Sequence, residues 1–339
     1  MSSQQKALIY PARFAPFKVE TFPKPSIGPD EVLIKIISSG LNPIDWEIQK
    51  YGIFFLEFPA ILGEDAAGYI DEIGKNVTSF IKGDRVIAQG LFNQYGGAYA
   101  EYLAVPAELV AKIPESMSFN KAASIPLAIG TAACANGIGL TPPWTPGGEG
   151  KYKGQGILVL GGSATVGQSV IQLAKLSGFD PIVVTASPHN EQFVKSFGAT
   201  HVIDRHSDVV PELQRGFPKG FKYIYDAIGI SSTQRIAWSV LASEGSLAVV
   251  NPLEDWLVTE IEKDKTKEVV YVYGIMYVHR DLGRGLFAAL GEYLEAGKIK
   301  PTEIEVLPNG LAGVADGLKK LEAQLVSGKK LVVRPSETP

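Results

Sequence analysis

The sequence has little cysteine and histidine. Cys134 is the only cysteine among 339 residues, which excludes an internal disulfide and a structural zinc site held by four cysteines. The four histidines, His189, His201, His206 and His279, all lie in the second half of the chain and lack the spacing of metal ligands. We therefore expect no bound metal. A single cysteine is also typical of the reducing cytosol, so we expect a cytoplasmic protein.

Long apolar runs and an excess of positive charge are also missing. No run approaches 18 apolar residues, and the first six residues lack the apolar region of a signal peptide. The net charge is −4 and the pI is about 5.7, so there is no basic footprint for nucleic acid or anionic membranes. The composition is that of a soluble globular protein, and we expect neither nucleic acid nor a membrane as a partner.

The most informative segment that is present is residues 157–167, ILVLGGSATVG. Residues 157–160 read as a buried parallel strand, a glycine turn follows, and residues 168–177 have apolar positions at helical spacing. A strand, a glycine turn and a helix N-terminus together hold a dinucleotide pyrophosphate on free N–H groups. Ala164 replaces the usual middle glycine. Glycine turns of this kind are also common in other α/β proteins. The residues expected to contact the cofactor are Gly161, Gly162, Ser163, Ala164, Thr165, Val166 and Gly167.

Alternating strands and helices continue beyond this segment and predict an open parallel sheet, the Rossmann fold. A helix is expected at residues 190–197. Further strands are expected at residues 180–187, 200–203, 222–226, 245–250 and 269–278. The apolar run 269–278 is either an edge strand that pairs across a homodimer or a strand covered by loops.

The end of the second strand indicates which cofactor binds. A site for NAD normally has an acidic residue about 20 residues beyond the glycine motif, but no acid lies between Ile182 and Asn190. Ser187, His189 and Asn190 can instead donate to a 2′-phosphate, and Arg205 at the next strand end can add charge. This pattern favours NADPH over NADH. The same residues can also simply cap the following helix.

The length of the chain predicts two domains. The first 125 residues carry short strands separated by turn signals, at 32–38, 67–73, 85–88 and 98–105, a pattern typical of an all-β barrel. After the Rossmann strands we expect helices at 285–296 and 313–327 and strands at 300–307 and 330–334. The final strand most simply returns to the sheet of the first domain. The predicted boundaries are 1–127 and 285–339 for the barrel domain, with 128–284 inserted as the Rossmann domain.

This order resembles the medium-chain dehydrogenase/reductase superfamily, and the resemblance covers essentially the whole chain. The motifs that carry it are GLNPID at 40–45, PAILGEDAAG at 59–68, GDRV at 83–86, GAYAEY at 97–102 and the glycine turn. The segments NPIDW and SPHN are most similar to the branch with quinone oxidoreductase-like proteins and fungal trans-acting enoyl reductases. The resemblance implies an α/β protein with a GroES-like β-barrel catalytic domain, an inserted Rossmann domain and bound NADPH.

The sequence departs from the zinc alcohol dehydrogenases at their metal ligands. Those enzymes place a cysteine where this chain has Asn42, and a His-Glu pair where it has Glu64 and Asp65. Without a metal to hold an alkoxide, we expect hydride transfer to an acceptor that spreads its charge, such as a conjugated carbonyl or a quinone. Two alternatives stay open: a trans-acting enoyl reductase that partners a polyketide synthase, and an NADPH-binding regulatory or RNA-binding protein with little turnover.

Candidate catalytic residues follow from the resemblance. Tyr51 lies in a region that carries an active-site tyrosine in some related enoyl reductases, where a tyrosine hydroxyl can donate a proton; solvent is the alternative donor. Asn42 is expected to contact substrate oxygen or cofactor ribose, or else to form a turn beside Pro43. Thr131 matches a position near the nicotinamide, or is a helix-interior threonine. The substrate is expected to meet aromatic side chains, either these or others of the core: Trp46, Phe54, Phe55, Phe92, Tyr95 and Tyr277.

Overall fold

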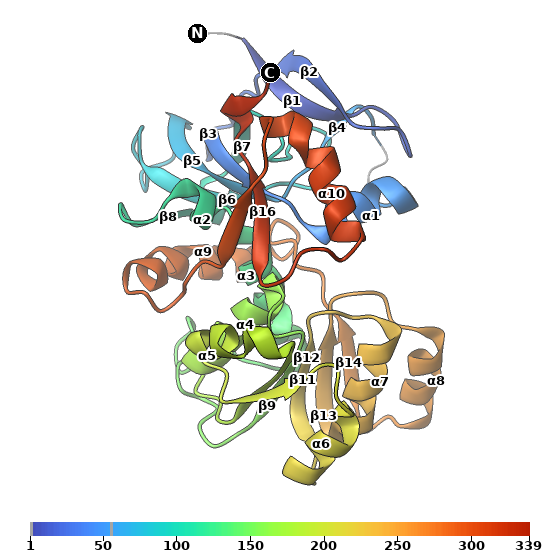
Figure 1. Cartoon of the computed structure of the whole chain (residues 1–339). Helices are drawn as coiled ribbons and strands as arrows, with labels where there is room; N and C mark the ends of the chain where they lie inside the picture. The colour runs from blue at the N-terminus through green and yellow to red at the C-terminus, as the bar shows by residue number, and fades with distance from the viewer. Residues whose placement is uncertain (1–2, 55–56) are drawn as a thin grey trace. The chain divides into compact units, whose positions relative to one another are not determined.

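The fold is known from a computed structural model that describes residues 3–54 and 57–339. The chain forms two compact units (Figure 1). Unit 1 comprises Met1–Leu127 and Ile275–Pro339, and unit 2 comprises Ala128–Gly274. Among the described residues no helix has the length and apolar character needed to cross a membrane. Phe55 lies outside the described residues.

Unit 1 is built on two β-sheets. The first has the order β2-β1-β4, from β2 (Lys18–Pro23), β1 (Gln4–Tyr10) and β4 (Ala60–Ile61). The second has the order β15-β16-β3-β5-β6-β8, with β7 also paired to β3. Its strands are β3 (Glu31–Gly40), β5 (Asp65–Ile73), β6 (Arg85–Gln89), β7 (Tyr102–Pro106), β8 (Val110–Lys112), β15 (Glu303–Val306) and β16 (Lys329–Val333). Apolar strand residues such as Val32, Ile34, Ile70 and Val86 pack together into a buried core.

The last strand returns to the sheet of the N-terminal segment, as the sequence predicted. β16 pairs antiparallel with β3, where Val332 lies opposite Gly40, and the N–H of Leu41 donates to the carbonyl of Leu331 at 2.9 Å. This pairing places residues near 330 beside the end of β3, where α1 (Pro43–Tyr51) begins. The other helices of unit 1 are α2 (Phe119–Ala122), α9 (Arg280–Glu295), α10 (Val314–Glu322) and the 3₁₀ turns η1 (Ala107–Leu109), η4 (Gly310–Gly313) and η5 (Pro335–Glu337).

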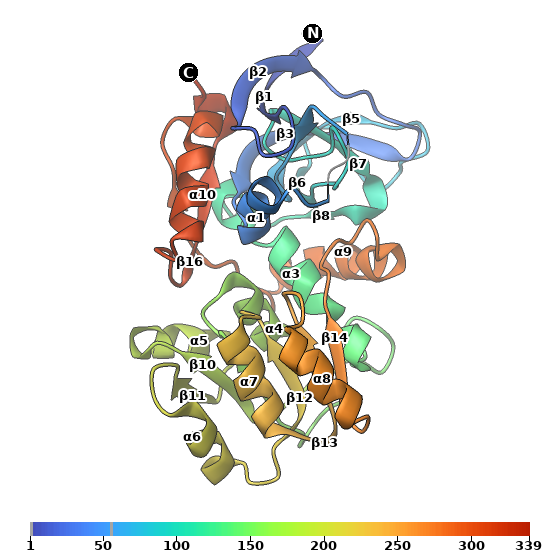
Figure 2. The ribbon, with the colours of Figure 1, turned by 90° about the vertical axis from the view of Figure 1, so that its right-hand side faces the viewer.

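Unit 2 is a doubly wound parallel sheet with the order β11-β10-β9-β12-β13-β14. Figure 1 shows α4 and α5 on one side of this sheet and α7 and α8 on the other, and Figure 2 shows α7 and α8 in front of it. Its strands are β9 (Ile157–Leu160), β10 (Ile182–Ala186), β11 (His201–Asp204), β12 (Phe221–Asp226), β13 (Leu241–Val249) and β14 (Glu268–Tyr271). Its helices are α3 (Pro126–Ala133), η2 (Cys134–Ile138), α4 (Thr165–Leu176), η3 (Pro188–Asn190), α5 (Glu191–Phe197), α6 (Val209–Gly216), α7 (Ser231–Val240) and α8 (Asp255–Lys263). The parallel strands wound by helices on both faces confirm the predicted Rossmann fold.

Several element boundaries differ from the sequence-based expectations. The strand expected at 269–278 is wrong beyond Tyr271, because the chain then leaves the sheet and packs Gly274 against Thr131. The helix expected at 313–327 ends at Glu322, two residues before Gln324 takes a left-handed backbone conformation. The strand expected at 98–105 begins only at Tyr102. Helix α4 begins at Thr165 instead of residue 168, directly after the glycine turn.

Candidate functional site

The glycine turn between β9 and α4 is tightly folded on its own backbone. Gly161 has a φ of +80°, a conformation that favours glycine. A Cβ added to Gly167 would lie 2.2 Å from the carbonyl oxygen of Gly161, so this position admits no side chain without movement of the backbone. The N–H of Gly161 donates to the hydroxyl of Thr185 at 2.9 Å, and the N–H of Gly162 donates to the Thr185 carbonyl at 2.8 Å. Two glycines and one threonine therefore fix the path of the turn.

Helix α4 begins where this turn ends. Ala164 is its N-cap residue and provides no side-chain cap. The N–H groups in the first turn of a helix have no partner within the helix, and the helix dipole makes this end attractive to anions. The turn residues Gly161–Gly167 lie at the carboxyl end of a parallel strand, where sheets of this type bind ligands, and their predicted contact with a dinucleotide pyrophosphate stays a prediction.

The ends of β10 and β11 bring the remaining predicted cofactor residues together. The guanidinium of Arg205 donates through Nε to the hydroxyl oxygen of Ser187 at 2.8 Å. The N–H of Arg205 donates to the carbonyl of Ala186 at 3.0 Å, and that of Asn190 donates to the carbonyl of Ser187 at 2.9 Å. The side chains of Arg205 and His189 are exposed, whereas Ser187 and Asn190 are buried. An exposed guanidinium thus borders a buried hydroxyl where the second strand ends.

Thr131 lies inside α3, where it is 9% exposed. Its carbonyl oxygen accepts a hydrogen bond from the hydroxyl of Tyr225 at 2.6 Å. Its Oγ1 faces Gly274 so closely that a Cβ added there would lie 2.1 Å away. Thr131 is therefore a helix residue packed within unit 2, and its predicted place near a nicotinamide stays a prediction.

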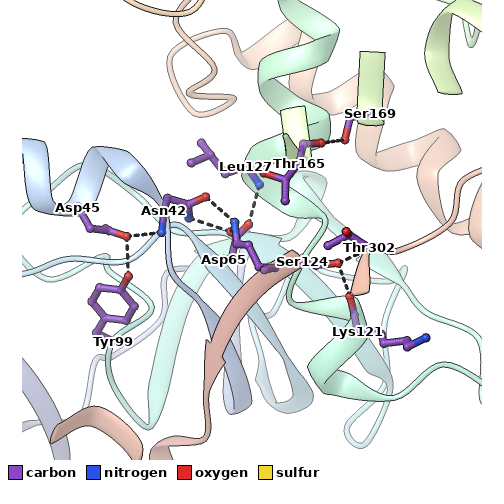
Figure 3. Close-up of polar contacts among 11 residues, drawn as sticks. Asn42, Asp45, Asp65, Tyr99, Lys121, Ser124, Leu127, Thr165, Ser169 and Thr302 are labelled. Carbon is purple, nitrogen blue, oxygen red and sulfur yellow. Dashed lines mark hydrogen bonds and ion pairs between the residues drawn. The ribbon is translucent and has the colours of Figure 1, made fainter. Parts of the chain in front are cut away.

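A buried polar cluster forms in unit 1 around Asn42 (Figure 3). The Nδ2 of Asn42 donates to Asp65 Oδ2 at 2.8 Å, and its Oδ1 accepts from the ammonium of Lys330 at 2.5 Å. Lys330 also forms an ion pair with Asp65 Oδ2 at 2.7 Å, and the N–H of Leu127 donates to Asp65 Oδ1 at 2.7 Å. The side chain of Lys330 is 3% exposed and that of Asp65 is fully buried. The cluster therefore contains a desolvated ion pair that orients the Asn42 amide.

A second part of the cluster contains two carboxyl groups in contact. Asp45 Oδ2 accepts from the N–H of Asn42 at 2.8 Å and from the hydroxyl of Tyr99 at 2.5 Å. Burial raises the pKa of Asp45 to about 6, and burial together with the neighbouring Asp45 charge raises the pKa of Glu64 well above its usual range. Among the described residues, Asp45 Oδ1 and Glu64 Oε2 have no hydrogen-bond partner. Their burial favours the neutral, protonated form of these carboxyl groups.

Tyr51 and Asn42 are not brought together. Asn42 caps the N-terminus of α1 and Tyr51 is its last residue, so the helix separates them by about 13 Å along its axis. Tyr51 is 57% exposed, and its ring lies 6.1 Å from that of Trp46. Of the other predicted aromatic residues, Phe54 pairs with Phe92 at 5.7 Å, while Tyr95 and Tyr277 are exposed. Tyr51 is thus exposed at the end of α1, whereas Asn42, 3% exposed, lies in the buried cluster.

Sequence reasoning missed several residues that organise these sites. Asp45 follows Asn42 at the spacing of a capping box, a signal that was available in the sequence. Lys330 stands in an otherwise apolar strand, which is unusual for a lysine and is a weaker signal. Asp226 ends β12 and is fully buried. Its Oδ1 accepts from the N–H groups of Ile228 and Gly229 at 3.1 and 2.9 Å, and burial raises its pKa.

Comparison with known families agrees with this fold. Residues 28–115 match the alcohol dehydrogenase GroES-like domain, and residues 165–281 match the zinc-binding dehydrogenase family. The chain belongs to the medium-chain dehydrogenase/reductase superfamily, a class of oxidoreductases whose fold binds nicotinamide cofactors. The α/β class with a GroES-like domain and a Rossmann domain is thereby confirmed.

The chain is similar to several known proteins over most of its length. The chain is 34% identical to the trans-enoyl reductase himH of Aspergillus japonicus, over 91% of this chain and 90% of that protein. It is 32% identical to the dehydrogenase pigH of Monascus ruber, over 97% and 98%. Among solved structures it is similar to the quinone oxidoreductase from Coxiella burnetii, with a TM-score of 0.77 and 25% identity over 98% of this chain and 99% of that one.

One of the matched families is described as a zinc-binding dehydrogenase, so the cluster at Asn42 is compared with the requirements of a zinc site. Within residues 3–54 and 57–339 no group of three histidine, cysteine or acidic side chains is arranged to hold a metal ion. At the position of the ligand cysteine, the Asn42 oxygen already accepts from Lys330, and both Asp65 oxygens are engaged. Zinc needs three good nitrogen, sulfur or oxygen ligands with free lone pairs. The residues of this cluster do not fit a zinc ion.

Proposed function

We propose that the protein is an NADPH-dependent reductase that transfers hydride to an activated C=C bond or a quinone without a metal ion. The residues at the end of β10 support the part of this proposal that concerns the nucleotide. There Arg205 is bonded to Ser187 at 2.8 Å, and no carboxylate lies between Ile182 and Asn190. A carboxylate at this point would repel a 2′-phosphate, whereas a guanidinium attracts it.

Two groups of residues in unit 2 would bind different parts of the nucleotide. The turn Gly161–Gly167 would hold the pyrophosphate on the first N–H groups of α4. Ser187, His189, Asn190 and Arg205 would hold the 2′-phosphate. Because Ser187 Oγ accepts from Arg205, its own proton is left to donate elsewhere. When bound, the nicotinamide supplies the hydride chemistry.

The choice of acceptor follows from the polar groups that unit 1 offers. The cluster at Asn42 is buried and bonded within itself, so the donors it retains for a substrate are the remaining hydrogens of the Asn42 amide and the Lys330 ammonium, neither of which is a Lewis acid. Donors of this kind stabilise charge that is spread over a conjugated system better than charge held on one alkoxide oxygen. The natural acceptors are therefore conjugated carbonyl compounds or quinones. Tyr51, at the exposed end of α1, is the proposed proton donor.

The direct experiment follows NADPH and NADH oxidation against matched enones, enals, quinones and saturated aldehydes, with identification of each product. We expect NADPH to be oxidised with the conjugated acceptors. The products should be enones and enals that have become saturated at the C=C bond, and hydroquinones formed from the quinones. Faster turnover with NADH would contradict the nucleotide half of the proposal. Turnover of saturated aldehydes alone would contradict the acceptor half.

A second candidate is a trans-acting enoyl reductase that receives its substrate on a carrier protein. The relatives named trans-enoyl reductase favour it: himH, at 34% identity, and grgB from a Penicillium species, at 29% identity over 92% of this chain. The two candidates differ in the form of the substrate. A trans-acting enzyme would reduce an enoyl thioester on its carrier domain and leave the same acyl group on N-acetylcysteamine untouched.

A further inference from the structure

The charge balance of the buried cluster in unit 1 depends on one cation. Asp45, Glu64 and Asp65 lie within it, and Lys330 is the only basic side chain that bonds to them in the described part of the chain. A buried carboxylate is stable only when it is paired or neutralised. Asp65 is paired with Lys330 at 2.7 Å. Asp45 is bonded to Tyr99 and to the Asn42 N–H.

The fold makes room for this ammonium at the end of β3. Gly40 lies opposite both Asp65 on β5 and Val332 on β16. A Cβ on Gly40 would lie 2.4 Å from the carbonyl oxygen of Ala123, 2.9 Å from Lys330 Cε and 3.1 Å from Asp65 Cβ. The absence of a side chain at Gly40 therefore leaves room both for the Ala123 backbone and for the lysine chain that reaches Asn42 and Asp65.

The ammonium also decides how Asn42 presents its amide. Its oxygen faces Lys330 Nζ and its nitrogen faces Asp65 Oδ2. A flipped amide would set N–H against ammonium and oxygen against carboxylate, and both contacts would be repulsive. Asn42 is thus held in one orientation by a charge that comes from the other end of the chain.

We propose that Lys330 is a built-in cation that takes the place of a metal ion in unit 1 and acts as a positioning residue for Asn42. A divalent ion at this point would meet an ammonium already within bonding distance of two of the oxygens it needs. The cation is thus part of the covalent chain, and the cluster works without an exchangeable ion. The effect of Lys330 on turnover rests on the reductase function proposed above, whereas its effect on metal binding does not.

The first test measures metal. The purified chain is dialysed against Zn²⁺ and then against metal-free buffer, after which zinc per chain and the melting temperature with and without a chelator are recorded. We expect no retained equivalent of zinc and no change in melting temperature with the chelator. One zinc per chain that is lost in Asp65→Asn would overturn the proposal.

The second test separates positioning from folding. Lys330→Met leaves Asp65 without its counter-charge, so the double variant Lys330→Met/Asp65→Asn, which removes both charges, is compared with it. Lys329→Met is the control, because Lys329 is the adjacent residue and pairs with Glu305 at the surface. We expect the double variant to regain melting temperature over the single variant and to bind NADPH normally. Its kcat should still be about tenfold to a hundredfold below that of the wild type.

A double variant with wild-type kcat would overturn the positioning role, since charge balance alone would then explain Lys330. If the wild-type protein reduces none of the acceptors, the proposed function fails. In that case, the zinc content and the melting temperatures still test the proposal that Lys330 is a built-in cation.

Discussion

The Nε of Arg205 lies 2.8 Å from the hydroxyl oxygen of Ser187, so the ends of β10 and β11 are joined by a hydrogen bond between two residues 18 positions apart. The two strands are parallel neighbours, with Ala186 opposite Asp204. Their side chains therefore meet at the carboxyl edge of the sheet, where Rossmann domains bind the adenosine part of their cofactors.

Arg205→Ala should weaken NADPH binding and leave NADH binding nearly unchanged. Loss of a hydrogen bond between a guanidinium and a phosphate raises the dissociation constant about tenfold to a hundredfold. Titration of the nucleotide fluorescence with each cofactor measures this. Arg215→Ala is the control, because Arg215 is an exposed arginine of the same unit on α6. Equal weakening of both cofactors would argue against a 2′-phosphate contact.

Gly167→Ala should disrupt the turn that begins α4. Its Cβ would lie 2.2 Å from the Gly161 carbonyl oxygen, so the backbone has to move, at a cost of about 1–3 kcal/mol. We expect lower unfolding stability and loss of nucleotide binding together. Gly216→Ala is the matched control, since a Cβ at Gly216 meets nothing within 4 Å. A Gly167→Ala protein that binds nucleotide as tightly as wild type would show that the turn has no part in binding.

The sequence predicted the strand and the helix on either side of the glycine turn well because their signals are local. Residues 157–160 form β9 as expected, and the glycine turn leads directly into α4. Ser187 and Arg205 were predicted to serve the same phosphate from two successive strand ends, and parallel neighbours do end at the same edge of a sheet. The details of their bond depend on side-chain conformations, which no pattern in the chain encodes.

The cluster in unit 1 could not be predicted in the same way. Lys330 and Asn42 are bonded across 288 positions, and their meeting requires β16 to pair with β3 in one register. The sequence indicated the return of the final strand but not its register, which decides whether Lys330 faces Asn42. The early end of β14 has a similar cause, because the chain leaves the sheet to pack Gly274 against Thr131.

Tyr51→Phe tests the proposed proton donor. Removal of a general acid lowers the rate about a hundredfold or more, and the ring contact with Trp46 is kept in the variant. We expect a lower kcat for C=C reduction with an unchanged melting temperature. Tyr69→Phe is the control, because Tyr69 is a partly exposed tyrosine of β5 whose ring packs on Phe119. A Tyr51→Phe rate equal to that of wild type would remove Tyr51 as the donor and leave solvent in that role.

Glu64→Gln tests the raised pKa of Glu64 through the pH dependence of stability. Unfolded acidic side chains have pKa values near 4, whereas burial raises the pKa of Asp45 to about 6 and that of Glu64 well above its usual range. The folded state therefore binds more protons than the unfolded state between these values. The stability that this pair contributes is fully present below about pH 4 and is lost as pH rises through the folded pKa values.

Glutamine keeps a neutral donor facing Asp45 at every pH, so Glu64→Gln should melt higher than wild type at pH 8, and the difference should shrink towards pH 4. Melting curves at a series of pH values measure this. Glu115→Gln is the control, because the Glu115 side chain is 92% exposed and should give no pH-dependent difference. A Glu64→Gln protein that melts lower than wild type at pH 8 would mean that Glu64 is ionised in the folded protein. In that case, Lys330 and the hydroxyl of Tyr99 would have to stabilise two further buried charges.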